Sequence, residues 1–235
     1  MRMTLRALTA LLGYPSAELQ AHIPDIREAL DTDGGLPRIA RCRLDPLLDS
    51  LATRDLLDLQ SDYSELFDRS RSLSLHLFEH VHGDSRERGQ AMIDLGQQYI
   101  DRGFLLASAE LPDFVPVFVE FASCLPPAEA REMLGQPVHV FAALQERLAK
   151  RCSPYAAVFG ALVAATGAKP DIDALAELEA RAPSDDPAKI DEDWEEKAVT
   201  FTQAAHEMGG PTGIVAKIRA AGKTMAAGAK SGTRS

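Results

Sequence analysis

The sharpest pattern of chemically active side chains lies between His76 and His80, where the sequence reads H-L-F-E-H. It matches the H-x-x-E-H pattern of inverted zincins. On a helix, His76 and His80 lie one turn apart and can share a Zn²⁺, with Glu79 as general base. Only three positions are fixed, however, and no recognisable motif supplies the acidic ligand that such a site also needs. The pattern therefore gives one hypothesis, a zinc metallohydrolase.

A second group of side chains, rich in carboxylates and phenylalanine, follows in the sequence E-L-P-D-F-V-P-V-F-V-E-F. Glu110, Pro112 and Asp113 are expected to form a loop that enters a helix, with Phe114 and Phe118 on one face of that helix. Exposed carboxylates beside an apolar groove suit a peptide with arginines next to an apolar helical face. Buried phenylalanines of an ordinary core fit the same pattern.

Several other kinds of site have no support in the sequence. It contains no G-x-x-x-x-G-K-[ST], no G-x-G-x-x-G and no G-x-S-x-G. Cys42, Cys124 and Cys152 are far apart, which argues against a disulfide framework or a thiolate zinc site. The net charge of -10 disfavours nonspecific binding to nucleic acid or to anionic lipid. No apolar run approaches the ~18 residues of a membrane span, and no cofactor is expected.

The elements that must position these residues are predicted to be helices. Apolar residues recur at spacings of three and four, as in Leu19, Ile23, Ile26 and Leu30. Pro24 falls inside that stripe and should kink its helix. Thr53 and Asp113 are expected to cap the helices that follow them. Because no segment alternates with period two, the fold class is all-α: a single-domain multi-helix bundle of about nine or ten helices.

Composition divides the chain into three parts. Residues 1–182 are expected to form the helical domain. Residues 183–205 surround the single Trp194 and are strongly acidic, with seven acidic residues between Asp185 and Glu196. Residues 206–235 form a basic tail, with five basic residues and no acidic ones from Lys217 onward. The tail is expected to be disordered because it offers little apolar surface, the alternative being that it folds against the acidic segment or a partner.

Two long strings carry a family resemblance. S-L-H-L-F-E-H-V-H-G-D-S-R-E-R-G-Q-A-M-I-D-L and the later E-L-P-D-F-V-P-V-F-V-E-F resemble the nitrate reductase assembly chaperones, the NarJ branch of the TorD-type all-helical chaperones. The acidic D-E-D-W-E-E-K-A-V-T-F is similar to a segment of the same family, so the resemblance runs from the first helix to Phe201. It implies the TorD/NarJ-type helical bundle and no catalytic activity.

The resemblance also implies a partner. Such chaperones are cytoplasmic and bind the N-terminal segment of the catalytic α subunit of respiratory nitrate reductase. They keep that subunit competent until the molybdenum cofactor is inserted and the complex assembles. Neither nucleic acid binding nor membrane insertion is expected. Contact with molybdenum cofactor biosynthesis proteins, the oligomeric state and the bound conformation of the client peptide are left open.

The TorD-type family carries an E-P-x-D-H signature in its recognition region. Here Glu110, Pro112 and Asp113 give E-x-P-D, with one residue inserted before the proline and Phe114 in place of histidine. This departure fits the NarJ branch and argues against transferring the wider family's nucleotide binding. In the resulting hypothesis an apolar groove takes the client's apolar face and three carboxylates meet its basic residues. The predicted client-binding residues are Leu77, Phe78, Glu79, Glu110, Pro112, Asp113, Phe114 and Phe118. A generic helical interaction module without a nitrate link is the other alternative.

Overall fold

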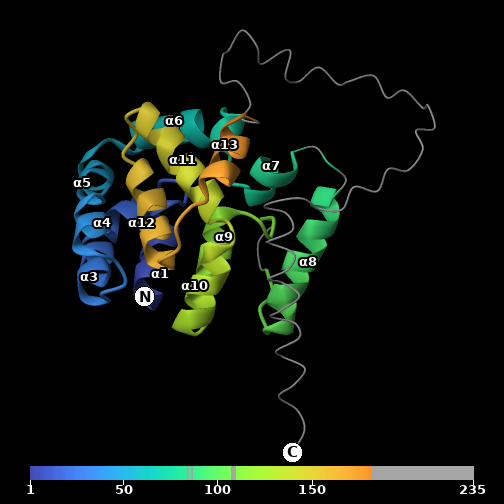
Figure 1. The fold of residues 1–235 in the computed structure, drawn as a ribbon. Coiled ribbons are helices and arrows are strands. Elements are labelled where there is room, and N and C mark those ends of the chain that lie inside the picture. The colour runs from blue at the N-terminus through green and yellow to red at the C-terminus, as the bar shows by residue number, and fades with distance from the viewer. Residues whose placement is uncertain (84, 86, 107–109, 181–235) are drawn as a thin grey trace, which may run out of the picture.

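The computed structural model describes residues 1–83, 85, 87–106 and 110–180, and in this part of the chain helices are joined by loops and turns (Figure 1). The predicted all-α class is confirmed. The described residues form thirteen α-helices and one 3₁₀ helix, more than the nine or ten expected, because several are very short. The acidic segment and the basic tail lie outside the described residues.

The elements follow in this order: α1 (Arg2–Leu11), α2 (Ala17–Ala21), α3 (Ile23–Thr32), α4 (Arg38–Cys42), α5 (Asp45–Thr53), α6 (Leu56–Phe67), the 3₁₀ helix η1 (Arg71–Leu73), α7 (Leu77–His82), α8 (Glu87–Asp101), α9 (Val115–Ser123), α10 (Pro127–Gly135), α11 (Val138–Lys150), α12 (Ala156–Thr166) and α13 (Ile172–Ala180). None of these helices is both long and apolar enough to cross a lipid bilayer.

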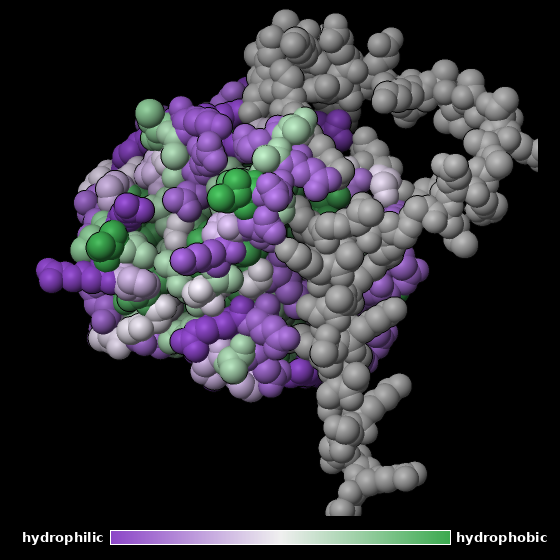
Figure 2. Space-filling model, in the orientation of Figure 1, coloured by the Kyte–Doolittle hydropathy of each residue, from purple (hydrophilic) through white to green (hydrophobic). Residues whose placement is uncertain are grey.

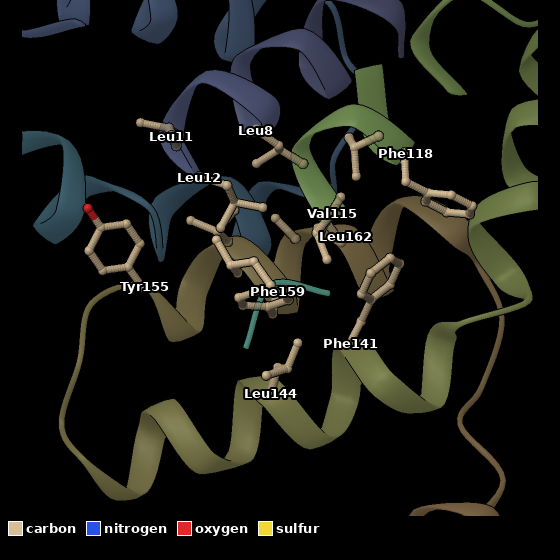
Figure 3. Close-up of a cluster of buried hydrophobic side chains, with 14 of the residues drawn as sticks. Leu8, Leu11, Leu12, Val115, Phe118, Phe141, Leu144, Tyr155, Phe159 and Leu162 are labelled. Atoms are coloured by element: carbon tan, nitrogen blue, oxygen red, sulfur yellow. The ribbon is translucent and has the colours of Figure 1, made fainter. Parts of the chain in front are cut away.

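The core lies where α1, α9, α11 and α12 meet. Side chains from all four helices point toward one another there, and Tyr155, directly before α12, closes one end of the cluster (Figure 3). Those labelled in the figure are Leu8, Leu11, Leu12, Val115, Phe118, Phe141, Leu144, Tyr155, Phe159 and Leu162. Burying each large apolar side chain stabilises the fold by about 1.5–3 kcal/mol before ordering costs. This cluster fixes α9 and the loop before it.

Two helix boundaries differ from the expectations. The chain does not kink at Pro24 within one helix, because it breaks at His22 and Pro24 takes an early position of α3, where its missing N–H costs nothing. Thr53 is the last residue of α5 and not a cap. Asp55 caps α6 instead, since its Oδ1 accepts a hydrogen bond from Leu57 N at 2.9 Å.

Helix α8 lies at the edge of the molecule, beyond α9 and α10 in Figure 1. It buries one side, with Ala91, Leu95 and Tyr99 turned toward the body. The opposite side carries Ile93 and Ile100, which are 65% and 52% exposed. A helix at an edge ordinarily turns polar residues outward, so this side of α8 is a candidate contact surface.

Candidate functional site

The entry to α7 and the loop before α9 are joined backbone to backbone. Leu77 N donates to Asp113 O at 3.1 Å and Val115 N donates to Leu75 O at 2.8 Å. An isolated antiparallel bridge pairs His76 with Phe114. The two stretches that the sequence placed in one predicted surface are therefore in direct contact, although they are far apart along the chain.

Asp113 is fully buried and caps α7. Its Oδ2 accepts from Phe78 N at 3.0 Å, and its Oδ1 accepts from His76 Nδ1 at 3.1 Å. His76, the residue before α7, makes no side-chain cap of its own, so Asp113 satisfies amides that the helix start leaves open. The expectation that Asp113 caps α9 is wrong, because α9 starts after Phe114 without a side-chain cap.

The two histidines of the H-x-x-E-H pattern face different partners. His76 has an extended backbone directly before α7, and its ring lies 5.4 Å from the ring of Phe114. The hydrogen bond to Asp113 raises the pKa of His76. His80 Nε2 donates to Ser74 O at 2.8 Å, which leaves Nδ1 as an acceptor facing Arg147 at 3.5 Å. Burial, aided by the Arg147 charge, lowers the pKa of His80 to about 4.

This arrangement does not form the site of an inverted zincin. The hypothesis needs His76 and His80 one helical turn apart, whereas His76 lies before the first turn of α7. Glu79, the proposed general base, forms an ion pair with Arg88 of α8 at 3.0 Å. Within the described ranges, no three His, Cys, Asp or Glu side chains are grouped so that they could hold a metal ion.

Arg147 of α11 is a buried cation that joins four elements. Its Nη1 donates to Ser72 O of η1 at 2.9 Å, and its Nη2 donates to Leu178 O of α13 at 3.0 Å. Its Nε donates to Glu179 at 2.9 Å, and its Nη1 lies beside His80 of α7. The planar fork of a guanidinium suits several acceptors at fixed positions. Arg147 therefore fixes where α13 leaves the helical body.

The apolar groove expected between α7 and α9 is closed in this structure. The side chains of Leu77, Phe78 and Phe118 are only 2–4% exposed. Phe118 is one of the buried side chains of the cluster drawn in Figure 3. Asp113 offers no carboxylate to solvent, contrary to the expectation that it is exposed. The other predicted residues are accessible: Glu79, Pro112 and Phe114 are half-buried and Glu110 is exposed. Client contact itself is not tested by this geometry and stays a prediction.

Exposed apolar side chains gather next to these residues instead. Six of the eleven large apolar side chains exposed in the described part of the chain lie between residues 93 and 111. They define the α8 apolar surface: Ile93, Ile100, Phe104, Leu105, Leu106 and Leu111. Tyr99 of α8 donates to Pro112 O at 2.7 Å, which brings the loop around Leu111 against the helix. This surface was not predicted from the sequence.

Two signals in the sequence point to the α8 apolar surface. Ile93 and Ile100 are seven residues apart, on the side of α8 opposite its buried residues. The run F-L-L at 104–106 follows directly after Gly103, outside any helical stripe. Asp94, Asp101 and Glu110 are exposed on the same helix or loop and add negative charge. On the coloured part of the face drawn in Figure 2, hydrophilic residues are interspersed with small hydrophobic areas.

The helical architecture defines the fold first. A solved structure described as a redox enzyme maturation protein from Archaeoglobus fulgidus shares the fold, with a TM-score of 0.50. The match covers 69% of this chain and 91% of that chain at 20% identity. At this identity the likeness concerns the fold alone.

The sequence comparisons define the family. The model of the nitrate reductase delta subunit family matches residues 16–161. The nitrate reductase molybdenum cofactor assembly chaperone NarJ of Escherichia coli K12 is 44% identical over 195 residues, 83% of each chain. NarW of the same strain is 35% identical over 200 residues, covering 85% of this chain and 84% of NarW. The chain belongs to the nitrate reductase delta subunit family, whose members named here are assembly chaperones and not catalysts.

Proposed function

We propose that this protein is a cytoplasmic, client-specific chaperone for nitrate reductase. It binds the N-terminal segment of the catalytic α subunit and keeps that subunit competent for molybdenum cofactor insertion and complex assembly. Family membership supports the assembly role, since relatives that match over most of their length are named as such chaperones. Contact with molybdenum cofactor biosynthesis proteins belongs to the same proposal.

The observation that carries the proposal is the α8 apolar surface. Its residues lie within the range that the family model matches, and they adjoin the E-x-P-D loop. Leu105 is 81% exposed and Leu111 is 43% exposed. A concentration of apolar side chains at one edge of a protein with a well-formed core marks a contact site more often than a structural accident. It suits the apolar face of an amphipathic peptide.

The predicted client-binding residues take two roles in this proposal. Phe114, Pro112 and Glu110 extend the α8 apolar surface and contact the client, and Glu79 attracts its basic residues. The buried side chains at positions 77, 78, 113 and 118 support the surface from beneath. Apolar contacts dominate affinity at about 25 cal/mol per Å² before ordering costs. Exposed ion pairs add only about 0.2–1 kcal/mol each and mainly orient the peptide.

Replacing one exposed leucine tests this surface. Leu105→Ser removes an apolar contact and should weaken binding of the α subunit's N-terminal peptide about tenfold, measured by titration calorimetry. The matched control is Ile172→Ser on α13, because Ile172 is 82% exposed and lies outside the surface. Both variants should unfold at the same urea concentration as the wild type, since neither side chain is buried.

The outcomes separate the function from the location. If Leu105→Ser and Ile172→Ser weaken peptide binding equally, or if neither weakens it, the α8 apolar surface is not the docking place. If the wild-type protein does not bind the peptide at all, the proposed client is wrong. Capture of the intact α subunit from anaerobically grown cells then decides whether nitrate reductase is the client through another segment.

A further inference from the structure

We infer that the α8 apolar surface has a second occupant, residues 213–225 of this same chain. In this inference, which rests on the proposed function, the segment docks on the surface when no client is present. The client peptide must then displace it. The chaperone would thereby cover its apolar side chains until a specific partner arrives, at the cost of a weaker apparent affinity for that partner.

The sequence of the segment has the chemical form proposed for the client. Ile214, Ile218, Ala221 and Met225 follow one another at spacings of 4, 3 and 4, the pattern of one helical face. Basic residues occupy other positions: Lys217, Arg219 and Lys223. No acidic residue follows Glu207. This combination of one apolar helical face with basic residues suits a surface that is both apolar and acidic.

The α8 apolar surface complements this segment in charge as well as in hydrophobicity. Asp94, Asp101 and Glu110 are exposed beside its apolar residues. The basic groups on the neighbouring side chains are already engaged, since Arg88 pairs with Glu79 and Arg102 pairs with Glu129. The surface therefore favours a basic apolar segment. The acidic residues 183–205 of the same chain would be repelled from it.

The tether is long enough for the contact. The described body ends at Ala180, where Arg147 fixes α13 through Leu178 O and Glu179. Residues 181–212 then separate this anchor from the segment, and a linker of that length can reach about 30 Å without being fully extended. In Figure 1, α13 and α8 lie on the same side of the molecule, with α7 between them.

Because residues 213–225 are tethered to the helical body, even weak binding to the α8 apolar surface gives high occupancy. An effective concentration on the order of 1 mM is typical for a linked segment. If the free segment binds with a Kd of about 100 μM, the surface is about 90% occupied in the absence of client. The apparent affinity for the client peptide is then reduced about tenfold, because only the uncovered fraction can bind it.

Point variants in the full-length chain test the inference. Ile214→Asp with Ile218→Asp disrupts the apolar face and should tighten client peptide binding about tenfold in titration calorimetry. The matched control is Ala216→Asp with Ala220→Asp, which makes the same change in charge at positions on the opposite side of the helical pattern. The control should bind the client peptide within about twofold of the wild type.

A second titration identifies the docking place. A synthetic peptide of residues 210–230 should bind the full-length Ile214→Asp/Ile218→Asp variant, and adding Leu105→Ser to that variant should weaken this binding. If the client peptide binds the wild type and both double variants equally, the inference fails while the proposed function stands. If the 210–230 peptide binds and the client peptide binds none of the proteins, the proposed function fails instead. Binding of the 210–230 peptide that Leu105→Ser leaves unchanged also overturns the inference.

Discussion

At the scale of single residues, burial decides what each polar side chain near α7 can do. Asp113 and His80 both stand among residues that resemble a binding or catalytic motif, yet both are used to hold the backbone. Asp113 accepts from Phe78 N, and His80 donates to Ser74 O. These polar groups are costly to bury unless they are hydrogen-bonded, so each is placed where a helix start or a turn needs a partner.

The lowered pKa of His80 predicts that the folded protein loses stability as the pH falls. Its pKa in the folded protein is about 4, below the ordinary value of 6.5, so the folded state binds fewer protons than the unfolded state. The stabilisation is complete above pH 6.5 and is lost as the pH falls toward 4. The loss should be on the order of 2–3 kcal/mol at pH 4, measured by urea unfolding.

His80→Gln should remove the loss of stability that comes from protonation of His80, since an amide can still donate to Ser74 O but does not gain charge. His22→Gln is the control, because the His22 side chain is largely exposed and its imidazole pairs with Asp25 at the surface. A pH profile of His80→Gln that runs parallel to that of the wild type would mean that the buried imidazole does not titrate in this way.

At the scale of elements, the position of α8 depends on contacts near its two ends. The Glu79–Arg88 ion pair joins it to α7, and the Tyr99–Pro112 hydrogen bond joins it to the loop before α9. Between α7 and α8 the chain turns at Gly83, whose φ of 53° and ψ of -132° lie in a region that only glycine occupies readily. The direction of α8, and with it the α8 apolar surface, follows from this turn.

Gly83→Ala should therefore destabilise the protein by about 1–3 kcal/mol, even though a Cβ at this position meets no other atom. The matched control is Gly89→Ala within α8, where a Cβ also has open space. That change should stabilise the protein by about 0.5–1 kcal/mol, because alanine favours the helix. Urea unfolding of both variants measures the difference. Shifts of equal sign would contradict a conformational role for Gly83.

At the scale of the whole molecule, the apolar spacing in the sequence was enough to predict an all-α fold. It reports which side of each helix is buried, as in α1 and α8. It could not report that Asp113 would be sealed inside, because that depends on the pairing of the α7 entry with a loop some 35 residues away in sequence. The α8 apolar surface was missed for a different reason: Ile93 and Ile100 lie outside the buried stripe of α8, and spacing does not report whether such residues are covered by another element.

At the scale of the whole molecule, Arg147 is the polar side chain that joins the most elements to one another within the described residues. It holds η1, α7 and α13 to α11, and α13 is the last helix before residues 181–235. Arg147→Lys keeps the positive charge but cannot reach three acceptors at once. It should destabilise the protein by about 2–4 kcal/mol, because Ser72 O and Leu178 O lose buried donors.

The location of this loss is more informative than its size. Amide hydrogen exchange should accelerate across Ile172–Ala180 in Arg147→Lys, while α1 and α9 stay protected by the core cluster. Arg131→Lys on α10 serves as the control, since Arg131 is exposed, and should leave exchange unchanged throughout. If α13 stays as protected in Arg147→Lys as in the wild type, its apolar contact through Leu178 holds it in place. The guanidinium would then not be what fixes the start of the tether.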